Sequence, residues 1–193
     1  MADHAIVHVP RLFEANTTGE SQVVDTNFEQ FYTSAFPRVY SFIRSQVGSV
    51  QTAQDVVARI FLKAFRHRAK APSGPAAMVW VFRIAHTVLI DHWRVEGRRE
   101  AASVSIDDLA EFPERQANPE AAYAEKERKA LLLSVMSELD KDDRTVLGLK
   151  FTAQQTNREI AVILDLSEGA VSMRLLRALR RLRERLLERG IQS

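Results

Sequence analysis

TNREIAVILDLSEGAVSMRLLRALRRLRER, residues 156–185, is the stretch of this chain that decides the fold. Residues 156–159 match a capping box, in which a threonine hydroxyl and a glutamate carboxylate each bond a backbone N–H at a helix start. The box predicts a helix from about Asn157 to Leu164. Residues 165–167 break that helix, and Ser167 is a good N-cap for a second one. Two helices joined by a tight turn predict a helix-turn-helix, which reads duplex DNA.

The second helix of this pair separates into a face to be buried and an outward arc. The side chains of the arc are small at its start and cationic further along. A recognition helix requires this, because its first turn approaches base edges while later arginines hold phosphate. An ordinary amphipathic surface helix with solvated arginines is the alternative for this helix alone. The stripe predicted to be buried is Val171, Leu175, Ala178, Leu179, Leu182 and Leu186. The predicted duplex-DNA site is Ser167, Ser172, Met173, Leu176, Arg177 and Arg180.

Charge is segregated along the 193 residues, although the net charge is only +2. Residues 59–99 hold nine Lys or Arg against two acids, and residues 100–129 hold eight acids against four bases. Residues 174–189 are basic again. The alternation indicates two nucleic-acid surfaces joined by a segment that is not one. The absence of cysteine excludes disulfides, iron-sulfur clusters and thiolate zinc sites.

Length and pattern favour an all-α chain of two small helical domains with a linker. Residues 1–24 lack a sustained period and are expected to form a flexible tail. Residues 25–99 carry aromatic and aliphatic side chains at helical spacing and form the first predicted domain. Residues 100–123 are acidic and contain two prolines, which predicts a flexible linker. The second predicted domain spans residues 124–190.

In the first domain, a helix is predicted from Asp55 to Phe65. Four of its neighbouring side chains project outward together, with an exposed leucine among charged residues. This composition is usual in a protein-protein contact, although single exposed leucines are common on surfaces. The predicted contact residues are Asp55, Arg59, Leu62 and Arg66.

A cationic loop at residues 67–77 leads into a long predicted helix from about Ala77 to Val95. One half of that helix interleaves aromatic side chains and cations, a combination that can stack on unpaired bases and neutralise phosphate. In the alternative interpretation the two tryptophans complete the core and the arginines are solvated. That face consists of Trp80, Arg83, His86, Thr87, Ile90, Trp93, Arg94 and Arg98. The predicted single-strand site is Lys70, Trp80, Arg83, His86, Thr87, Arg94 and Arg98.

Most of residues 28–187 resembles the extracytoplasmic-function (ECF) sigma factors of bacterial RNA polymerase, members of the sigma-70 family. DVVARIFLKAF (55–65) resembles the second conserved region of that family, and WVFRIAHTVLIDHWR (80–94) resembles its promoter-melting helix. LDKDDRTVL (139–147), EIA (159–161) and LSEGAVSMRLLRALRRLRERL (166–186) resemble the fourth region. The order and the spacing of these segments, with a linker between the second and third, make the combination specific.

The resemblance implies a subunit that gives core RNA polymerase its promoter choice. Region 2 would dock on the polymerase clamp helices through Asp55, Arg59 and Leu62, and would open the −10 element. Arg83, His86, Thr87 and Arg94 match the helix that faces the melted strand, and the loop of residues 70–76 matches a base-capturing loop. Region 4 would bind the −35 element through Ser172, Met173, Leu176 and Arg177 and lean on the polymerase flap. An anti-sigma factor is a further implied partner.

This chain departs from the family pattern at several positions. Arg59 stands where the family commonly has an acid, which reverses one charge on the docking surface. His86 and Thr87 replace a frequent arginine and asparagine on the melting helix. Residues 153–156 also lack the glycine that is usual just before the helix-turn-helix.

Other function classes fit the sequence less well. A two-domain helix-turn-helix regulator that acts without core polymerase is the first alternative, and it would bind its operator alone. A hydrolase built on His86, Asp91 and His92 lacks enough convergent ligands for a metal site. We therefore expect no enzyme activity, no catalytic or metal site and no cofactor. Without a secretory signal or an apolar run of spanning length, a cytoplasmic protein that does not insert into membranes is expected.

Overall fold

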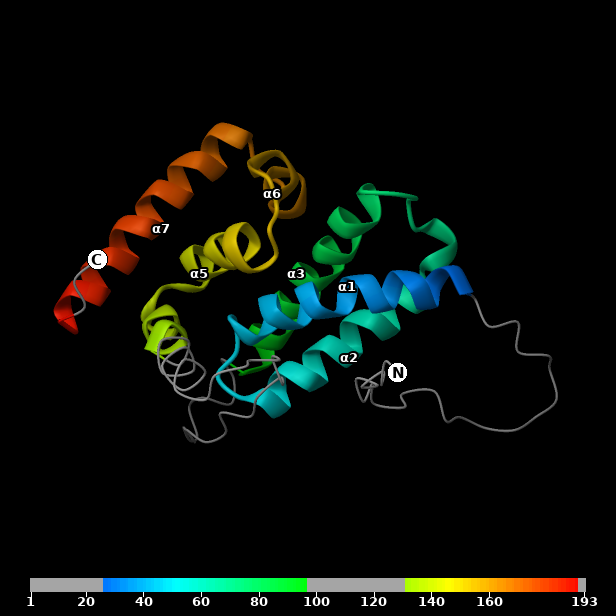
Figure 1. Cartoon of the computed structure of the whole chain (residues 1–193), viewed down its shortest axis with the longest axis horizontal. Coiled ribbons are helices and arrows are strands. Elements are labelled where there is room, and N and C mark those ends of the chain that lie inside the picture. Colours follow the sequence, from blue (N-terminus) through cyan, green and yellow to red (C-terminus); the bar gives the residue numbers. More distant parts are fainter. Residues whose placement is uncertain (1–25, 97–130, 191–193) are drawn as a thin grey trace, which may run out of the picture.

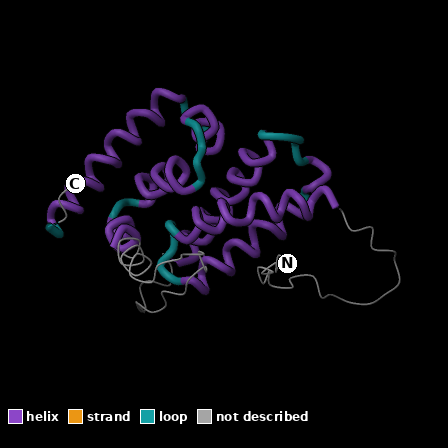
Figure 2. Tube along the Cα trace, viewed as in Figure 1, coloured by secondary structure: helices purple, strands orange, loops and turns teal. Residues whose placement is uncertain are grey.

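The computed structural model describes residues 26–96 and 131–190, and every regular element in those ranges is a helix (Figures 1 and 2). This confirms the predicted all-α class. The predicted tail, the linker and Arg98 lie outside the described residues. The first module contains α1 (Thr26–Arg44), α2 (Val50–Arg66), the 3-10 turn η1 (Arg68–Lys70) and α3 (Ala76–Glu96). The second contains helical residues 131–138, α5 (Lys141–Leu147), the π-helix η3 (Gly148–Thr152), α6 (Asn157–Leu164) and α7 (Glu168–Glu188).

Helix α2 begins at Val50, five residues before the predicted start at Asp55. The Ser49 hydroxyl caps it by accepting a hydrogen bond from the backbone N–H of Thr52 at 3.0 Å. Serine is among the preferred N-cap residues, so Ser49 could have marked this start from the sequence. The inner side of α2 is buried from Val56 through Ala64.

The helix-turn-helix forms as the sequence predicted. The Thr156 hydroxyl accepts from the backbone N–H of Glu159 at 3.2 Å, and the Glu159 carboxylate accepts from the backbone N–H of Thr156 at 2.7 Å. Asp165 ends α6 in the left-handed conformation at φ 56°. The Ser167 hydroxyl then caps α7 by accepting from the backbone N–H of Ala170 at 3.1 Å. All three local signals are therefore confirmed.

A single turn of π-helix precedes the helix-turn-helix, and the sequence did not predict it. The backbone N–H of Ala153 donates to the carbonyl of Gly148 at 2.8 Å, five residues back. Gln154, within the stretch of residues 153–156 that lacks glycine, then takes a positive φ of 54°. A side chain in this conformation costs about 1–2 kcal/mol, because Cβ crowds the following carbonyl oxygen.

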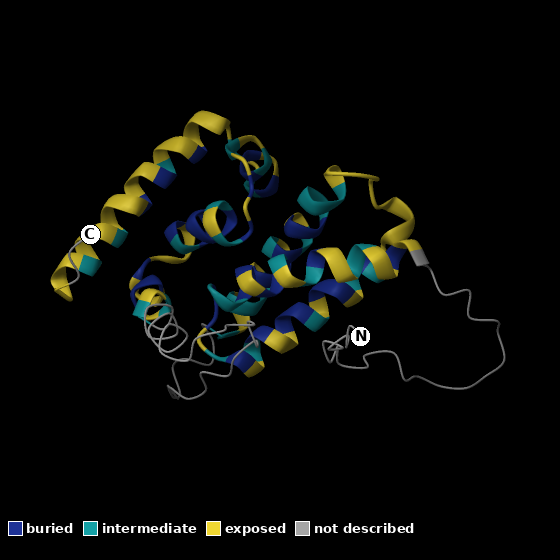
Figure 3. Ribbon diagram, in the orientation of Figure 1, coloured by how far each residue is buried: buried dark blue, intermediate teal, exposed yellow. Residues whose placement is uncertain are grey.

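The two modules share one continuous hydrophobic core. Buried side chains extend from Phe28 on α1 to Ala178 on α7, and α3 contacts α6 while α1 contacts η3 (Figure 3). The Arg38 guanidinium on α1 also donates from Nε to the carbonyl oxygen of Ala153 at 3.1 Å. The second module therefore rests directly on the first.

One prediction about α7 is wrong. Val171, Leu175 and Ala178 are buried as expected, but Leu179 is 40% exposed. The buried residues of α7 lie between Val171 and Ala178, and Leu179 follows them at the edge of the stripe. Leu182 still packs partly against the core.

Among the described residues, every helix is too short or too polar to span a bilayer.

Candidate nucleic-acid interface

The first turns of α7 present an uncovered surface (Figure 3). Ser167 is exposed at the N-cap, and all residues of the predicted outward arc are exposed as well. Met173 is 55% exposed and Leu176 is 54% exposed, although both are apolar. Because they lie three residues apart on one helix, these two side chains are neighbours on the surface, and contiguous apolar patches rimmed by polar residues mark interaction sites. The remaining exposed members of the arc are Gly169, Ser172, Arg177 and Arg180.

The Ser172 hydroxyl is held by two protein hydrogen bonds. It donates to the carbonyl oxygen of Glu168 at 3.0 Å, and it accepts from the side-chain amide Nδ2 of Asn157 at 3.0 Å. The Asn157 Oδ1 in turn accepts from the Nζ of Lys150 at 2.9 Å. A chain of side chains therefore runs from η3 through the start of α6 to the recognition surface of α7.

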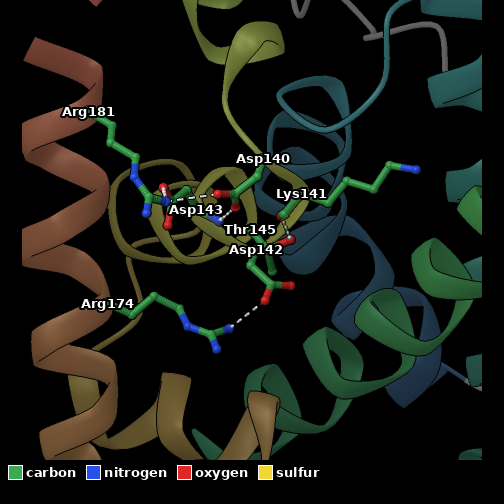
Figure 4. A network of polar contacts seen from close by, with 7 residues as sticks. All are labelled: Asp140, Lys141, Asp142, Asp143, Thr145, Arg174 and Arg181. Atoms are coloured by element: carbon green, nitrogen blue, oxygen red, sulfur yellow. Dashed lines mark hydrogen bonds and ion pairs between the residues drawn. The ribbon is translucent and has the colours of Figure 1, made fainter. Parts of the chain in front are cut away.

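Three aspartates of α5 and its cap bind two arginines on the side of α7 that borders the arc (Figure 4). Arg181 donates to the Asp140 carboxylate at 2.8 Å and to the Asp143 carboxylate. Arg174 pairs with Asp142 at 3.3 Å. Asp143 is buried, with a side chain only 5% exposed, so this carboxylate depends on Arg181 for its partner.

The arginines of α7 thus divide into two groups. The hydrogen bond to Asp143 raises the pKa of Arg181 above its usual value, with further help from the charge of that carboxylate. Arg174 and Arg181 have acidic partners on α5, whereas the Arg177 Nε only donates back to the Met173 carbonyl at 3.3 Å. Arg177 and Arg180 are therefore the cations of the arc best placed for phosphate or bases.

The predicted single-strand face of α3 is split in two by the structure. Arg83, Thr87, Ile90 and Arg94 lie exposed along one edge. The Thr87 hydroxyl donates to the Arg83 carbonyl at 3.0 Å, and Arg94 pairs with Asp91 at 3.2 Å. Since the Arg94 pair is exposed on both sides, it contributes little stability, and the guanidinium is accessible from solvent.

The aromatic members of that face are drawn towards the core. Trp80 is partly buried, and its ring centroid lies 6.2 Å from that of Phe31. Trp93 also packs against the core, and the Lys141 ammonium of α5 lies 5.5 Å from its ring centroid. This agrees with the alternative interpretation for the tryptophans, because a ring packed against the core presents only part of its face to a base.

His86 lies on the side of α3 that faces the second module. Burial lowers the pKa of His86, and the charge of Asp142 on α5 partly opposes that shift. The imidazole is therefore favoured in its neutral form, which can both donate and accept a hydrogen bond. In this arrangement the charge of Asp142 reaches His86, so the imidazole lies near α5 of the second module.

The loop before α3 is exposed, as a base-contacting loop would need to be. Lys70 ends the 3-10 turn η1 with its side chain in solvent. Gly74 takes a φ of 65°, a backbone conformation that favours glycine, and so it fixes the turn that leads into α3. Arg98, the last predicted member of this site, lies outside the described residues.

The four predicted contact residues of α2 share one exposed face. Asp55, Arg59, Leu62 and Arg66 are all exposed, and Leu62 is 51% exposed. The side-chain amide of Gln51 approaches the Asp55 carboxylate at 3.4 Å, one turn away. The face therefore keeps an apolar centre between charges, as the sequence predicted.

Sequence reasoning missed the residues that support α7 rather than those that it exposes. Lys150 donates to Asn157, which donates to Ser172. Asp142 and Asp143 pair with Arg174 and Arg181. Arg174 and Arg181 lie seven residues apart, on one side of the helix, and that spacing against the acidic run at residues 140–143 was the available signal.

Comparisons with known proteins match both modules. The model of the family "Sigma-70 region 2" matches residues 31–99, and that of "Sigma-70, region 4" matches residues 135–184. "ECF RNA polymerase sigma factor SigL" of Mycobacterium tuberculosis strain H37Rv is 30% identical over 145 residues, covering 75% of this chain and 80% of that protein. "Probable RNA polymerase sigma factor RfaY" of Xanthomonas campestris is 31% identical over 144 residues, but this chain spans only 35% of its length.

A solved structure agrees with the fold. The sigma factor RpoE of Bartonella quintana, crystallised with the anti-sigma factor NepR, superposes with a TM-score of 0.67 at 22% identity, covering 83% of this chain and 97% of that one. At this identity the likeness establishes the fold alone. Both region models match in the family order, and a 30% identical relative is covered over four fifths of its length. The chain therefore belongs to the ECF sigma factors of the sigma-70 family.

Proposed function

We propose that this chain binds core RNA polymerase and directs it to promoters, and that it catalyses no reaction of its own. The observation that carries the proposal is the uncovered arc at the start of α7. This arc combines two exposed apolar side chains, Met173 and Leu176, with Arg177 and Arg180, which the acids of α5 leave available. It has the shape and charge of a surface that enters the major groove of duplex DNA.

The two modules divide the promoter between them in this proposal. In the proposal, α7 binds the upstream −35 element as duplex DNA through Ser172, Met173, Leu176 and Arg177. The capped turn at Ser167 lies close to the sugar-phosphate backbone of that DNA. The exposed edge of α3, formed by Arg83, Thr87 and Arg94, faces the melted strand of the −10 element, together with Lys70. Trp80, His86 and Arg98 remain further predicted members of that site.

Strand opening has an energetic cost that this edge must offset. Unstacking a base costs a few kcal/mol, and contacts to the extruded base and its backbone recover part of it. Two modest contacts on one chain also raise the effective concentration of each module at its own element. Promoter choice then depends on both modules together.

The exposed face of α2 is the proposed dock for core polymerase. Leu62 supplies the apolar centre, and Asp55, Arg59 and Arg66 supply the rim. Leu62→Asp should abolish co-elution of the chain with core enzyme in size-exclusion chromatography, because it places a charge in the centre of the contact. Leu187→Asp is the matched control, since Leu187 is similarly exposed, at 48%, but lies at the far end of α7. Equal loss of co-elution in both variants would rule out α2 as the docking face.

An anti-sigma factor is the third proposed partner, and transcription in the cytoplasm is the proposed setting. The solved relatives include sigma factors in complex with the anti-sigma factor NepR and with the cytosolic domain of CnrY. A partner of this kind would compete with core polymerase or promoter DNA for the exposed faces of α2 and α7.

A further inference from the structure

The Ser172 hydroxyl on the recognition helix has only one hydrogen-bonding position left for a ligand. A serine hydroxyl carries one hydrogen to donate and two lone pairs that accept. Its hydrogen goes to the Glu168 carbonyl, one turn earlier on α7, and one lone pair receives the Asn157 amide. Ser172 is exposed on the predicted DNA surface, which leaves the second lone pair as the position for a ligand. As it stands, Ser172 can accept a hydrogen bond from DNA but has no hydrogen to give.

Lys150 fixes the orientation of the Asn157 amide. An ammonium group only donates, so the atom of Asn157 that lies 2.9 Å from Nζ of Lys150 must be the carbonyl oxygen. The NH₂ end of the same amide then points towards Ser172. The hydrogen-bond network therefore settles which end of the side chain reaches the recognition helix.

We propose that Asn157, anchored by Lys150, is a positioning residue that makes Ser172 an acceptor-only reader of the −35 element. In the major groove only adenine N6 and cytosine N4 carry hydrogens to donate, whereas guanine O6 and N7 and thymine O4 are acceptors. Ser172 therefore selects adenine or cytosine on the strand that it contacts. The inference rests on the proposed function, since it requires α7 to read duplex DNA.

Asn157 matters because it controls the rotation of the hydroxyl. A hydroxyl that accepts a hydrogen bond becomes a better donor, so the Asn157 contact strengthens the bond from Ser172 to the Glu168 carbonyl. Without that amide, the hydroxyl turns more easily and offers its hydrogen to guanine or thymine. Loss of Asn157 should thus broaden the base preference at one position rather than weaken binding at all of them.

The first experiment locates the base. Core RNA polymerase is reconstituted with the full chain and transcribes a template library in which the upstream element is randomised. The position that loses its preference in Ser172→Ala marks the contact. At that position, a base analogue without the exocyclic amino group, such as 2′-deoxynebularine for adenine, should lower transcription about 2- to 10-fold with the native chain, the range expected for one hydrogen bond. It should cause no further loss with Ser172→Ala.

The second experiment tests the role of Asn157. Asn157→Ala should raise the use of guanine and thymine at the marked position and leave the other positions unchanged. Asn157→Asp should keep the preference for amino-bearing bases, because the carboxylate still binds Lys150 and gives the hydroxyl hydrogen a partner inside the protein. Arg158→Ala, an exposed neighbour on α6, is the matched control and should not alter any base preference.

Several outcomes would overturn the inference. If the base analogue lowers transcription equally with the native chain and with Ser172→Ala, Ser172 does not read the amino group. An unchanged preference in a folded Asn157→Ala variant would remove Asn157 from the role. Both results leave initiation itself intact, whereas failure of the native chain to direct initiation from any template would refute the proposed function as well.

Discussion

The side-chain amide of Gln46 on α1 donates from Nε2 to the backbone carbonyl of Arg144 on α5, at 3.1 Å. This bond joins residues 98 positions apart and connects the first module to the second. Gln46 is almost fully buried. Gly148 lies against the same amide, so that a Cβ added there would meet Gln46 Nε2 at 2.4 Å and the Phe42 ring at 3.1 Å. The two modules approach this closely only because residue 148 has no side chain.

Gly148→Val should therefore loosen the contact between the modules. Overpacking of this kind costs about 1–3 kcal/mol, and the buried, hydrogen-bonded Gln46 has little room to move aside. We expect a lower free energy of unfolding in urea and a larger radius of gyration in small-angle X-ray scattering. Gly48→Ala is the control, because no atom lies within 4 Å of a Cβ at that position. Identical scattering from both variants and the native chain would contradict the described arrangement.

Asp143→Asn should destabilise the second module and displace α7. The buried carboxylate loses its charge while Arg181 keeps its own, so the charge-assisted bond between α5 and α7 is weakened. We expect a fall of several degrees in Tm and a weaker −35 preference in transcription by the reconstituted holoenzyme. Asp142→Asn should have a much smaller effect, because the Asp142 side chain is 74% exposed and its ion pair with Arg174 is screened by water. A larger loss for Asp142→Asn would mean that the α5 network does not position α7.

The stability of the chain should fall in mild acid partly through His86. Burial lowers the folded-state pKa of His86 below its usual 6.5, so the unfolded chain takes up a proton at a higher pH than the folded one. This contribution is complete above pH 6.5 and is lost as the pH falls below it. Urea unfolding at about pH 7.5 and about pH 5.5 should show a smaller difference in His86→Gln than in the native chain. His67→Gln changes an exposed histidine and should keep the native difference in unfolding free energy between the two pH values. If His67→Gln reduced that difference as much as His86→Gln does, burial of His86 would not be its cause.

Arg177→Ala should weaken recognition of the −35 element. If the guanidinium reads a base, the loss is about 1–3 kcal/mol and is confined to one position of the element. If it holds phosphate, the loss is uniform across sequences and the salt dependence falls. Competition between promoter templates with single base changes, transcribed by the reconstituted holoenzyme, separates these results. Arg174→Ala is the comparison, because Arg174 is paired with Asp142 and its loss should change base preference less. A larger change for Arg174→Ala than for Arg177→Ala would mean that Arg174, and not Arg177, contacts the element.

The local parts of the fold could be predicted because their causes lie within a few residues. The capping box at Thr156 and the cap at Ser167 involve partners three residues away, and the backbone N–H of Asp165 donates to the carbonyl of Ala161, four residues back. The π-helix was not predicted, because it depends on how residues 148–152 meet α1. The docking of the two modules was also beyond the sequence, since Gln46 and Arg144 lie far apart in the chain.

In the candidate site, too, features set within one helix could be predicted, and features set by contacts with other helices could not. Helical spacing correctly placed the outward arc of α7 and the exposed face of α2. It could not tell that Trp80 and Trp93 lean on the core, because their environment is set by Phe31 on α1 and Lys141 on α5. Likewise, spacing along one helix could not reveal that Asn157 on α6 orients a serine on α7.

Run-off transcription tests the central claim most directly. Purified core RNA polymerase is supplied with a genomic template library, with and without the chain, and the 5′ ends of the transcripts are sequenced. We predict a new set of start sites that share an upstream and a start-proximal element, and that disappears when the arc of α7 is altered by a combined Arg177→Ala and Ser172→Ala substitution. Start sites that are the same with and without the chain would contradict the account.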